Sequence, residues 1–214
     1  MATADDAPQI DDRRRFKELR GELLWCRALI VPVEFVGLIA ALIFAAVVTD
    51  AGTCFNSMMS DLAFLITGTI ACAPVLALPT LAAKRGSGPF LLAALAMAAA
   101  GVAGTLGCRA VGADPDAWFL MMFGVSAAAA GLVEGIFERS VATTFCGMVG
   151  GAAGGVAGPM VCRALMGGTY LDLGIILFVV GALSGNLAIG LSLALGRWMR
   201  DLPKKKQRQT EPTQ

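Results

Sequence analysis

Apolar residues gather into six long blocks along the chain, with short polar connections between them. A helix that crosses the hydrocarbon core of a membrane needs about 20 predominantly apolar residues. The six blocks have this length, and they predict spanning helices at roughly residues 28–49, 62–83, 89–108, 117–137, 141–162 and 173–196. We therefore expect an all-α polytopic membrane protein whose six transmembrane helices form tandem hairpins.

The two ends of the chain are polar and divide it into three parts. Residues 28–196 form the transmembrane domain, between an N-terminal segment (1–27) and a basic tail (197–214), whose last part, 204–214, we predict to be disordered. In the first segment, apolar residues recur at spacings of three and four, which predicts either an amphipathic helix on the membrane surface or a charged, solvated helix start. This segment lacks the apolar core of a signal peptide, so we expect the first span to be an uncleaved anchor. Both basic ends are expected to contact anionic lipid.

Positive charge is distributed unevenly between the two sides that this topology creates. Of the 17 Lys and Arg residues, all except Arg109 and Arg163 fall on the side that carries both termini. The positive-inside rule then predicts a multi-pass protein of the bacterial inner membrane with both termini in the cytoplasm.

The composition also excludes several kinds of chemistry. The chain has no His, so it lacks the usual general base and the commonest metal ligand, and it has no Cys-x-x-Cys pair. Its net charge of +1 gives no reason to expect a nucleic-acid partner. We expect no metal, no cofactor and no enzymatic activity.

Ten residues of the chain occur twice. GVAGTLGCRA (101–110) returns as GVAGPMVCRA (155–164), 54 residues later and with seven of ten positions identical. Each copy ends an odd-numbered predicted span, so the copies keep the same orientation in the membrane. Parallel repeats of this kind favour a ring or a stack of hairpins over the inverted repeats of many transporters.

The fifth predicted span carries glycine at every fourth position in two series. The first series is Gly147, Gly151 and Gly155, and the second is Gly150, Gly154 and Gly158. Without a hydrophobic drive between helices in lipid, such small residues allow close backbone contact. The two series predict either packing within the six-helix bundle or a self-association surface, including that of a tightly packed pore helix.

Residues 131–158, GLVEGIFERSVATTFCGMVGGAAGGVAG, carry a further pattern. This segment resembles a recurring bacterial membrane module of the form GLxEGxxxRSxxxxxxGxxGGxxGG, found beside forkhead-associated domains. The resemblance implies a glycine-packed membrane unit, or glycine zipper, whose biochemical role is not characterised. It does not imply phosphothreonine binding, because no forkhead-associated domain is present in this chain.

Two carboxyl groups fall within predicted spans at similar depth near the cytoplasmic side. Glu34 shares a helix face with Arg27, and Glu134 is followed closely by Arg139. Ionisable groups at membrane depth are costly unless paired, and they often mark functional sites. These residues predict either ion pairs that fix the bundle or a proton or cation site that Glu34 and Glu134 share.

Other polar residues in the spans allow similar alternatives. Asn186 lies in the middle of the sixth span and predicts an inter-helix hydrogen bond or, less often, a substrate ligand. Pro32, Pro74 and Pro79 each interrupt helical hydrogen bonding and free carbonyl groups that could bind a cation.

The opposite, outer side carries its own candidates. Cys54, Cys108 and Cys162 all fall on this side. Cys108 and Cys162 occupy equivalent places in the repeat, so they either form a disulfide with each other or remain, like Cys54, free thiols. Arg109 and Arg163 are expected to pair with nearby aspartates, to contact lipid phosphate or to attract an anionic solute. Asp114, Asp116 and Asp172 are the nearby aspartates.

Two function classes follow from these patterns. The first is a non-enzymatic membrane protein with a structural, assembly or regulatory role, which packs through its glycine faces and meets itself, another membrane protein or anionic lipid. The alternative is a small ion channel or secondary transporter that uses Glu34 and Glu134. An intramembrane enzyme is disfavoured, because the spans contain neither His nor two Asp.

Overall fold

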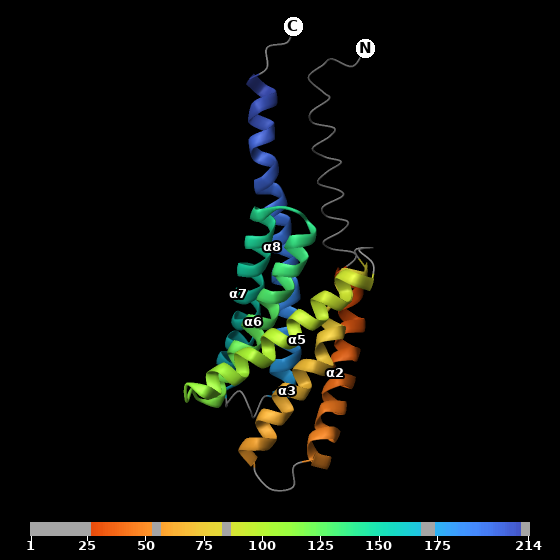
Figure 1. Cartoon of the computed structure of the whole chain (residues 1–214), viewed down its shortest axis with the longest axis vertical. Coiled ribbons are helices and arrows are strands. Elements are labelled where there is room, and N and C mark those ends of the chain that lie inside the picture. Colours follow the sequence, from red (N-terminus) through yellow and green to blue (C-terminus); the bar gives the residue numbers. More distant parts are fainter. Residues whose placement is uncertain (1–26, 53–56, 83–86, 168–173, 211–214) are drawn as a thin grey trace.

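Helices make up nearly all of the described part of the chain. The computed structural model describes residues 27–52, 57–82, 87–167 and 174–210, and these form seven α-helices (Figure 1). They are α2 (Arg27–Gly52), α3 (Ser57–Leu76), α4 (Leu78–Ala82), α5 (Ser87–Ala110), α6 (Pro115–Phe137), α7 (Val141–Met166) and α8 (Gly174–Thr210). Six stretches of them are long and apolar enough to cross a membrane. The predicted all-α fold with six spans is confirmed.

The second span is broken next to Pro79, one of the three prolines expected to interrupt helical hydrogen bonding, whereas Pro32 and Pro74 lie inside α2 and α3. α3 ends at Leu76 and α4 begins at Leu78. Pro79 has no backbone N–H and cannot continue the helical ladder. The N–H of Thr80 instead bonds to the carbonyl of Ala77 at 3.0 Å, three residues back rather than four. The chain therefore turns at Ala77 while still within the span Leu62–Thr80.

The tail provides one correction to the sequence prediction. α8 continues as helix to Thr210, so the prediction that residues 204–214 are disordered is wrong for residues 204–210. The span has already nucleated the helix, and each added Lys, Arg or Gln extends it at little cost. The predicted amphipathic helix at the N-terminus and the final residues 211–214 lie outside the described residues.

The helices run alternately up and down the bundle. α6, α7 and α8 pack against one another, α5 packs against α6 and α3, and α2 packs against α3 and α8. The start of α2 and the end of α8 lie toward the same end of the bundle (Figure 1). Below, this end is called the terminal end.

The two halves of the bundle are packed with different side chains. Away from the terminal end, the core is aromatic: the rings of Phe119, Phe123 and Phe178 pack edge to face or tilted, at centroid distances of 4.9–5.6 Å. Toward the terminal end, the core consists largely of alanine, with Val133 and Leu193 among the larger residues. Large apolar side chains on the outer faces, such as Phe44 on α2, are exposed and so suit contact with lipid.

Candidate functional site

A buried carboxyl group connects α2 to α8. Glu34 is 2% exposed and Asn186 is 7% exposed. The Nδ2 of Asn186 donates a hydrogen bond of 2.8 Å to Oε1 of Glu34. The inter-helix hydrogen bond predicted for Asn186 is therefore present, and its partner is Glu34.

The break between α3 and α4 adds a third element to this contact. Nδ2 of Asn186 also lies 3.4 Å from the carbonyl oxygen of Leu76, the last residue of α3. In an unbroken helix, the N–H of Thr80 would reach this oxygen, but it bonds to Ala77 instead. The amide of Asn186 therefore donates to the Leu76 carbonyl, which the break leaves without its helical N–H partner. We call Glu34, Asn186 and the Leu76 carbonyl the polar centre.

Apolar side chains border the polar centre both toward the terminal end and away from it. One turn beyond Glu34, Leu38 is fully buried and packs into the same cluster as Phe178 and Leu177. One turn from Asn186 in the other direction along α8, Ile189 is also fully buried. The polar centre thus lies between apolar layers, where every electrostatic interaction is stronger than in water.

The chemistry of the polar centre is that of hard oxygen and amide groups. Among the described residues, it brings together a carboxylate, a side-chain amide and a backbone carbonyl. The described residues contain no group of three or more His, Cys, Asp or Glu that could hold a metal ion. Such a donor set suits a proton or a weakly bound monovalent cation better than a transition metal or a divalent ion.

The second predicted carboxyl group lies in a different setting. Glu134 is 7% exposed on α6, one turn before Glu138, whose carboxylate accepts a hydrogen bond of 2.7 Å from Arg197 of α8. The structure thus gives Glu34 a partner in Asn186, and a site that Glu34 and Glu134 share stays a prediction. The side chain of Arg27 lies outside the described residues.

An ion pair between Glu138 and Arg197 joins the end of α6 to α8, and no pattern in the sequence predicted it. The residues lie 59 positions apart, and no local spacing links them. The available signal was topological: α6 and α8 both run toward the terminal end, and each carries a charge where it leaves the membrane. Arg139, which was expected to accompany Glu134, is instead exposed at the turn between α6 and α7.

The first glycine series packs against α6. A methyl group added at Gly147 would meet the carbonyl of Gly131, and one at Gly155 would meet the carbonyl of Phe123. A methyl group added at Gly151 would likewise lie against the carbonyl of Ala127, 2.7 Å from its carbon atom. The three positions on α6 are four residues apart, so the two antiparallel helices lie backbone to backbone over a little more than two turns.

The second series packs against α8. Side chains added at Gly150, Gly154 and Gly158 would collide with α8. The residues they would meet are Ser192 and Ala188, Ala188 and Ser184, and Ser184 and Val180, respectively. Ser184 also donates a hydrogen bond of 2.8 Å to the carbonyl of Gly154. Both glycine faces of α7 are thus occupied within the chain, which leaves neither of them open to a second molecule.

The end of the bundle away from the termini holds the repeated Cys-Arg pairs. Arg163 forms an ion pair with Asp116 at 3.0 Å, as one of the predicted pairings expected. Asp114 caps α6 by accepting a 2.8 Å hydrogen bond from the N–H of Ala117. Cys108 and Cys162 are free thiols, partly buried against the aromatic cluster. Cys54 and Asp172 lie outside the described residues.

No protein-family model, no curated protein and no solved structure matches this chain.

Proposed function

We propose that this polytopic membrane protein is non-enzymatic and moves protons or monovalent cations, as a small channel or an ion-coupled transporter, with Glu34 as the ion-binding group. The observation that carries the proposal is the position of Glu34. Its carboxyl group is buried at membrane depth, and it is hydrogen-bonded across the bundle to Asn186 beside a broken helix.

The cost of placing a carboxyl group there supports a functional role. A carboxylate inside the membrane must be compensated by a proton, a cation or a base, and residues that bear this cost commonly serve ion pathways. Broken helices at membrane depth occur where the freed backbone lines a site, as in transporters. Here the carbonyl freed at Leu76 lies against the amide that holds Glu34.

The aromatic half of the bundle supports an alternating mechanism over an open pore. Leu38, Leu177 and Phe178 are fully or almost fully buried and lie in one cluster beyond the polar centre. An ion at Glu34 would have to pass this layer to reach the far side. Exchange of an ion therefore requires α2 and α8 to separate, and breaking the Glu34–Asn186 hydrogen bond is the natural first step.

The test is ion flux into liposomes that contain the purified protein. A pH-sensitive dye inside the vesicles reports proton entry, with and without a sodium or potassium gradient. Glu34→Gln keeps the hydrogen bond but removes the titrating group, so it should abolish flux. Glu134→Gln is the matched control: a Glu34-centred mechanism predicts that its flux persists, and the shared site predicts that it is lost as well. Wild-type vesicles no leakier than empty ones would overturn the proposal.

A structural or regulatory role is the second candidate, and the packing of α7 favours it. Both glycine series are used to build a close α6–α7–α8 block. The glycines of the module-like segment 131–158 are accounted for by this packing, including Gly135, which lies against Thr144. In this role the block would be a rigid scaffold, and partners would meet its outer faces. The test is whether the protein retains a partner in mild detergent that a variant with a polar outer α7 face, Val149→Asn with Val161→Asn, loses.

With either function, we propose that the protein lies in the bacterial inner membrane with both termini in the cytoplasm. The unequal distribution of Lys and Arg supports this orientation. The basic end of α8 and the N-terminal segment would then face anionic lipid. A fluorescent protein that folds only in the cytoplasm, fused after Gln214, should fluoresce, whereas periplasmic alkaline phosphatase at the same position should stay inactive.

A further inference from the structure

A groove of about 400 Å³ lies on the outside of the bundle where α6 turns into α7. Its walls are apolar, and its rim carries Arg139 and Ser140. The apolar lining residues are Leu132, Ile136, Val141, Phe145 and Met148. All but Met148 are classed as exposed large apolar side chains, with Phe145 at 60%. In a membrane protein, such a surface is covered by lipid chains.

Arg139 holds an unusual backbone conformation at this rim. Its φ of +53° is the only positive value for a non-glycine residue in the part of the chain that the structure describes. Glycine or asparagine is favoured in this left-handed position after a helix, where a side chain is strained. Residues held in such conformations by the surrounding structure cluster at functional sites. At this position the side chain is a guanidinium group.

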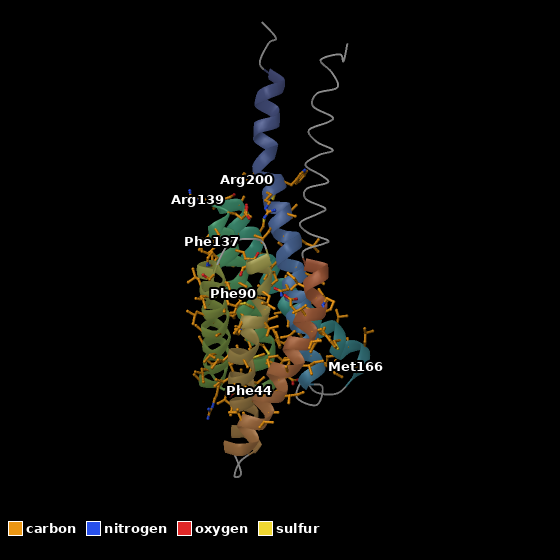
Figure 2. The ribbon with its side chains drawn as sticks, turned by 90° about the vertical axis from the view of Figure 1, so that its right-hand side faces the viewer. Phe44, Phe90, Phe137, Arg139, Met166 and Arg200 are labelled. Carbon is orange, nitrogen blue, oxygen red and sulfur yellow. The ribbon has the colours of Figure 1, made fainter. Side chains whose placement is uncertain are left out.

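The charge of Arg139 is available to a ligand. Its side chain is exposed and forms no ion pair with the described residues. Figure 2 shows Arg139 at the same end of the bundle as Arg200, with Phe44 and Met166 toward the other end. This is the terminal end, where the span Ile176–Arg200 leaves the apolar layer. The guanidinium group therefore lies at the level of lipid headgroups.

The surroundings of Arg139 favour a phosphate oxygen. The Oγ of Ser140 accepts the N–H of Thr143 as the cap of α7, which leaves the hydroxyl proton for an external acceptor. Thr144, by contrast, donates its hydroxyl to the carbonyl of Ser140 at 2.9 Å. The positive end of the α7 dipole lies at the same place and adds to the attraction for an anion.

From this geometry we infer that the groove between α6 and α7 is a specific site for an anionic phospholipid. Arg139 and Ser140 hold the phosphate, and an acyl chain lies along Phe145, Ile136 and Met148. Charge complementarity selects the anionic headgroup, and the apolar walls distinguish a lipid from free phosphate. This site is separate from the polar centre and does not depend on the proposed ion transport.

The test is native mass spectrometry of the full-length protein in detergent, titrated with phosphatidylglycerol or with phosphatidylcholine. The wild type should bind one phosphatidylglycerol more tightly than any phosphatidylcholine. Arg139→Gln should weaken the phosphatidylglycerol adduct about fivefold, the effect of one basic residue near an anionic headgroup. Arg139→Lys should retain most of the binding. Equal binding of the two lipids, or full binding by Arg139→Gln, would overturn the inference.

Two further variants separate binding from folding and lipid from phosphate. Arg139→Gly removes the charge but relieves the backbone strain, so it should lose the adduct while unfolding at the same or a higher temperature. Phe145→Ala should weaken the adduct, whereas Phe44→Ala on α2 should not, although the two side chains are 60% and 61% exposed. Equal effects of the two phenylalanine variants, or displacement of the lipid by millimolar inorganic phosphate, would contradict an acyl-chain site.

Discussion

Asn186 and Glu34 are separated by 152 positions in the chain, yet their side chains share a hydrogen bond of 2.8 Å inside the bundle. The bond joins the first span to the last. α2 packs mainly against α3, and this hydrogen bond adds a polar contact to the apolar cluster through which α2 and α3 already meet α6 and α8. Its strength therefore bears on both the stability of the bundle and any movement between the two parts.

A double-mutant cycle on this pair should show favourable coupling. Asn186→Ala leaves the Glu34 carboxyl and the Leu76 carbonyl without their amide partner, and Glu34→Ala removes the other side of the bond. Hydrogen bonds between membrane helices contribute about 0.6 kcal/mol on average and up to about 1.7 kcal/mol. Because both residues here are buried, we expect coupling of about 1 kcal/mol or more, measured as the free energy of unfolding in detergent micelles.

The neighbouring residue on α8 provides the control for this cycle. Leu187 is 50% exposed and faces away from the polar centre. Leu187→Ala should change the free energy of unfolding little and should show no coupling to Glu34→Ala. Coupling as large for Leu187 as for Asn186 would mean that the effect reports general loosening of α8 rather than the hydrogen bond.

Adding a methyl group to the glycine face of α7 should destabilise the folded monomer. In Gly151→Ala, the new carbon would lie too close to the carbonyl of Ala127, so α6 and α7 must move apart. Overpacking of this kind costs about 1–3 kcal/mol. Chemical unfolding in micelles measures the loss, and light scattering measures the size of the particle.

Gly107 is the matched control on α5. A methyl group there meets nothing within 4 Å, so Gly107→Ala should gain about 0.5–1 kcal/mol from its better helix propensity. If Gly151→Ala instead left stability unchanged and reduced the particle size, the glycine face would be a contact between molecules. The structure predicts the opposite result.

The spans could be predicted from sequence because each is a local feature. A block of about 20 apolar residues is visible without knowledge of its neighbours, and the span ends at Thr49, Phe137 and Met166 lie within a few residues of the predicted ends. The glycine spacing likewise indicated close packing faces on α7. It did not indicate that α6 and α8 occupy them, since that depends on which helices become neighbours.

The polar centre could be predicted only in pieces. Glu34, Asn186 and Pro79 were each noticeable as polar or helix-breaking residues within apolar blocks. Their meeting depends on the packing of the first, second and sixth spans, which no spacing in the sequence encodes. The same holds for Glu138 and Arg197. The helical continuation to Thr210 was missed because composition reports polarity, while an established helix extends through polar residues at little cost.

The two ion pairs at opposite ends of the bundle should respond differently to salt and to mutation. The side chains of Arg197 and Glu138 are 24% and 14% exposed, against 41% and 28% for Arg163 and Asp116. Arg197→Gln should cost about 2 kcal/mol of unfolding free energy, because a hydrogen bond to a charged and poorly solvated group is lost. Arg163→Gln should cost under about 1 kcal/mol, and this cost should shrink in high salt.

Exchanging the charges of Glu138 and Arg197 tests whether their ion pair itself accounts for the loss of stability. Glu138→Arg combined with Arg197→Glu should recover part of the stability that either single change loses. No recovery would indicate that each residue acts through other neighbours. A cost for Arg163→Gln equal to that for Arg197→Gln, and insensitive to salt, would contradict the difference in exposure.

The thiols of Cys108 and Cys162 should be free, and they should differ in reactivity from Cys72. Cys72 is 1% exposed within the aromatic cluster, whereas the other two are only partly buried near the end of the bundle. Variants that keep one of these cysteines and lack the remaining five should react with a small maleimide quickly at Cys162 and slowly at Cys72, because the reagent must reach the sulfur. When the full chain is alkylated after denaturation without reductant, mass spectrometry should find an alkyl group on both Cys108 and Cys162, which a disulfide between them would prevent. If that disulfide were found, the ends of α5 and α7 would have to lie closer together than the structure places them. With a membrane-impermeant maleimide on intact spheroplasts, labelling of Cys162 would also support the predicted orientation, and labelling only after the membrane is permeabilised would reverse it.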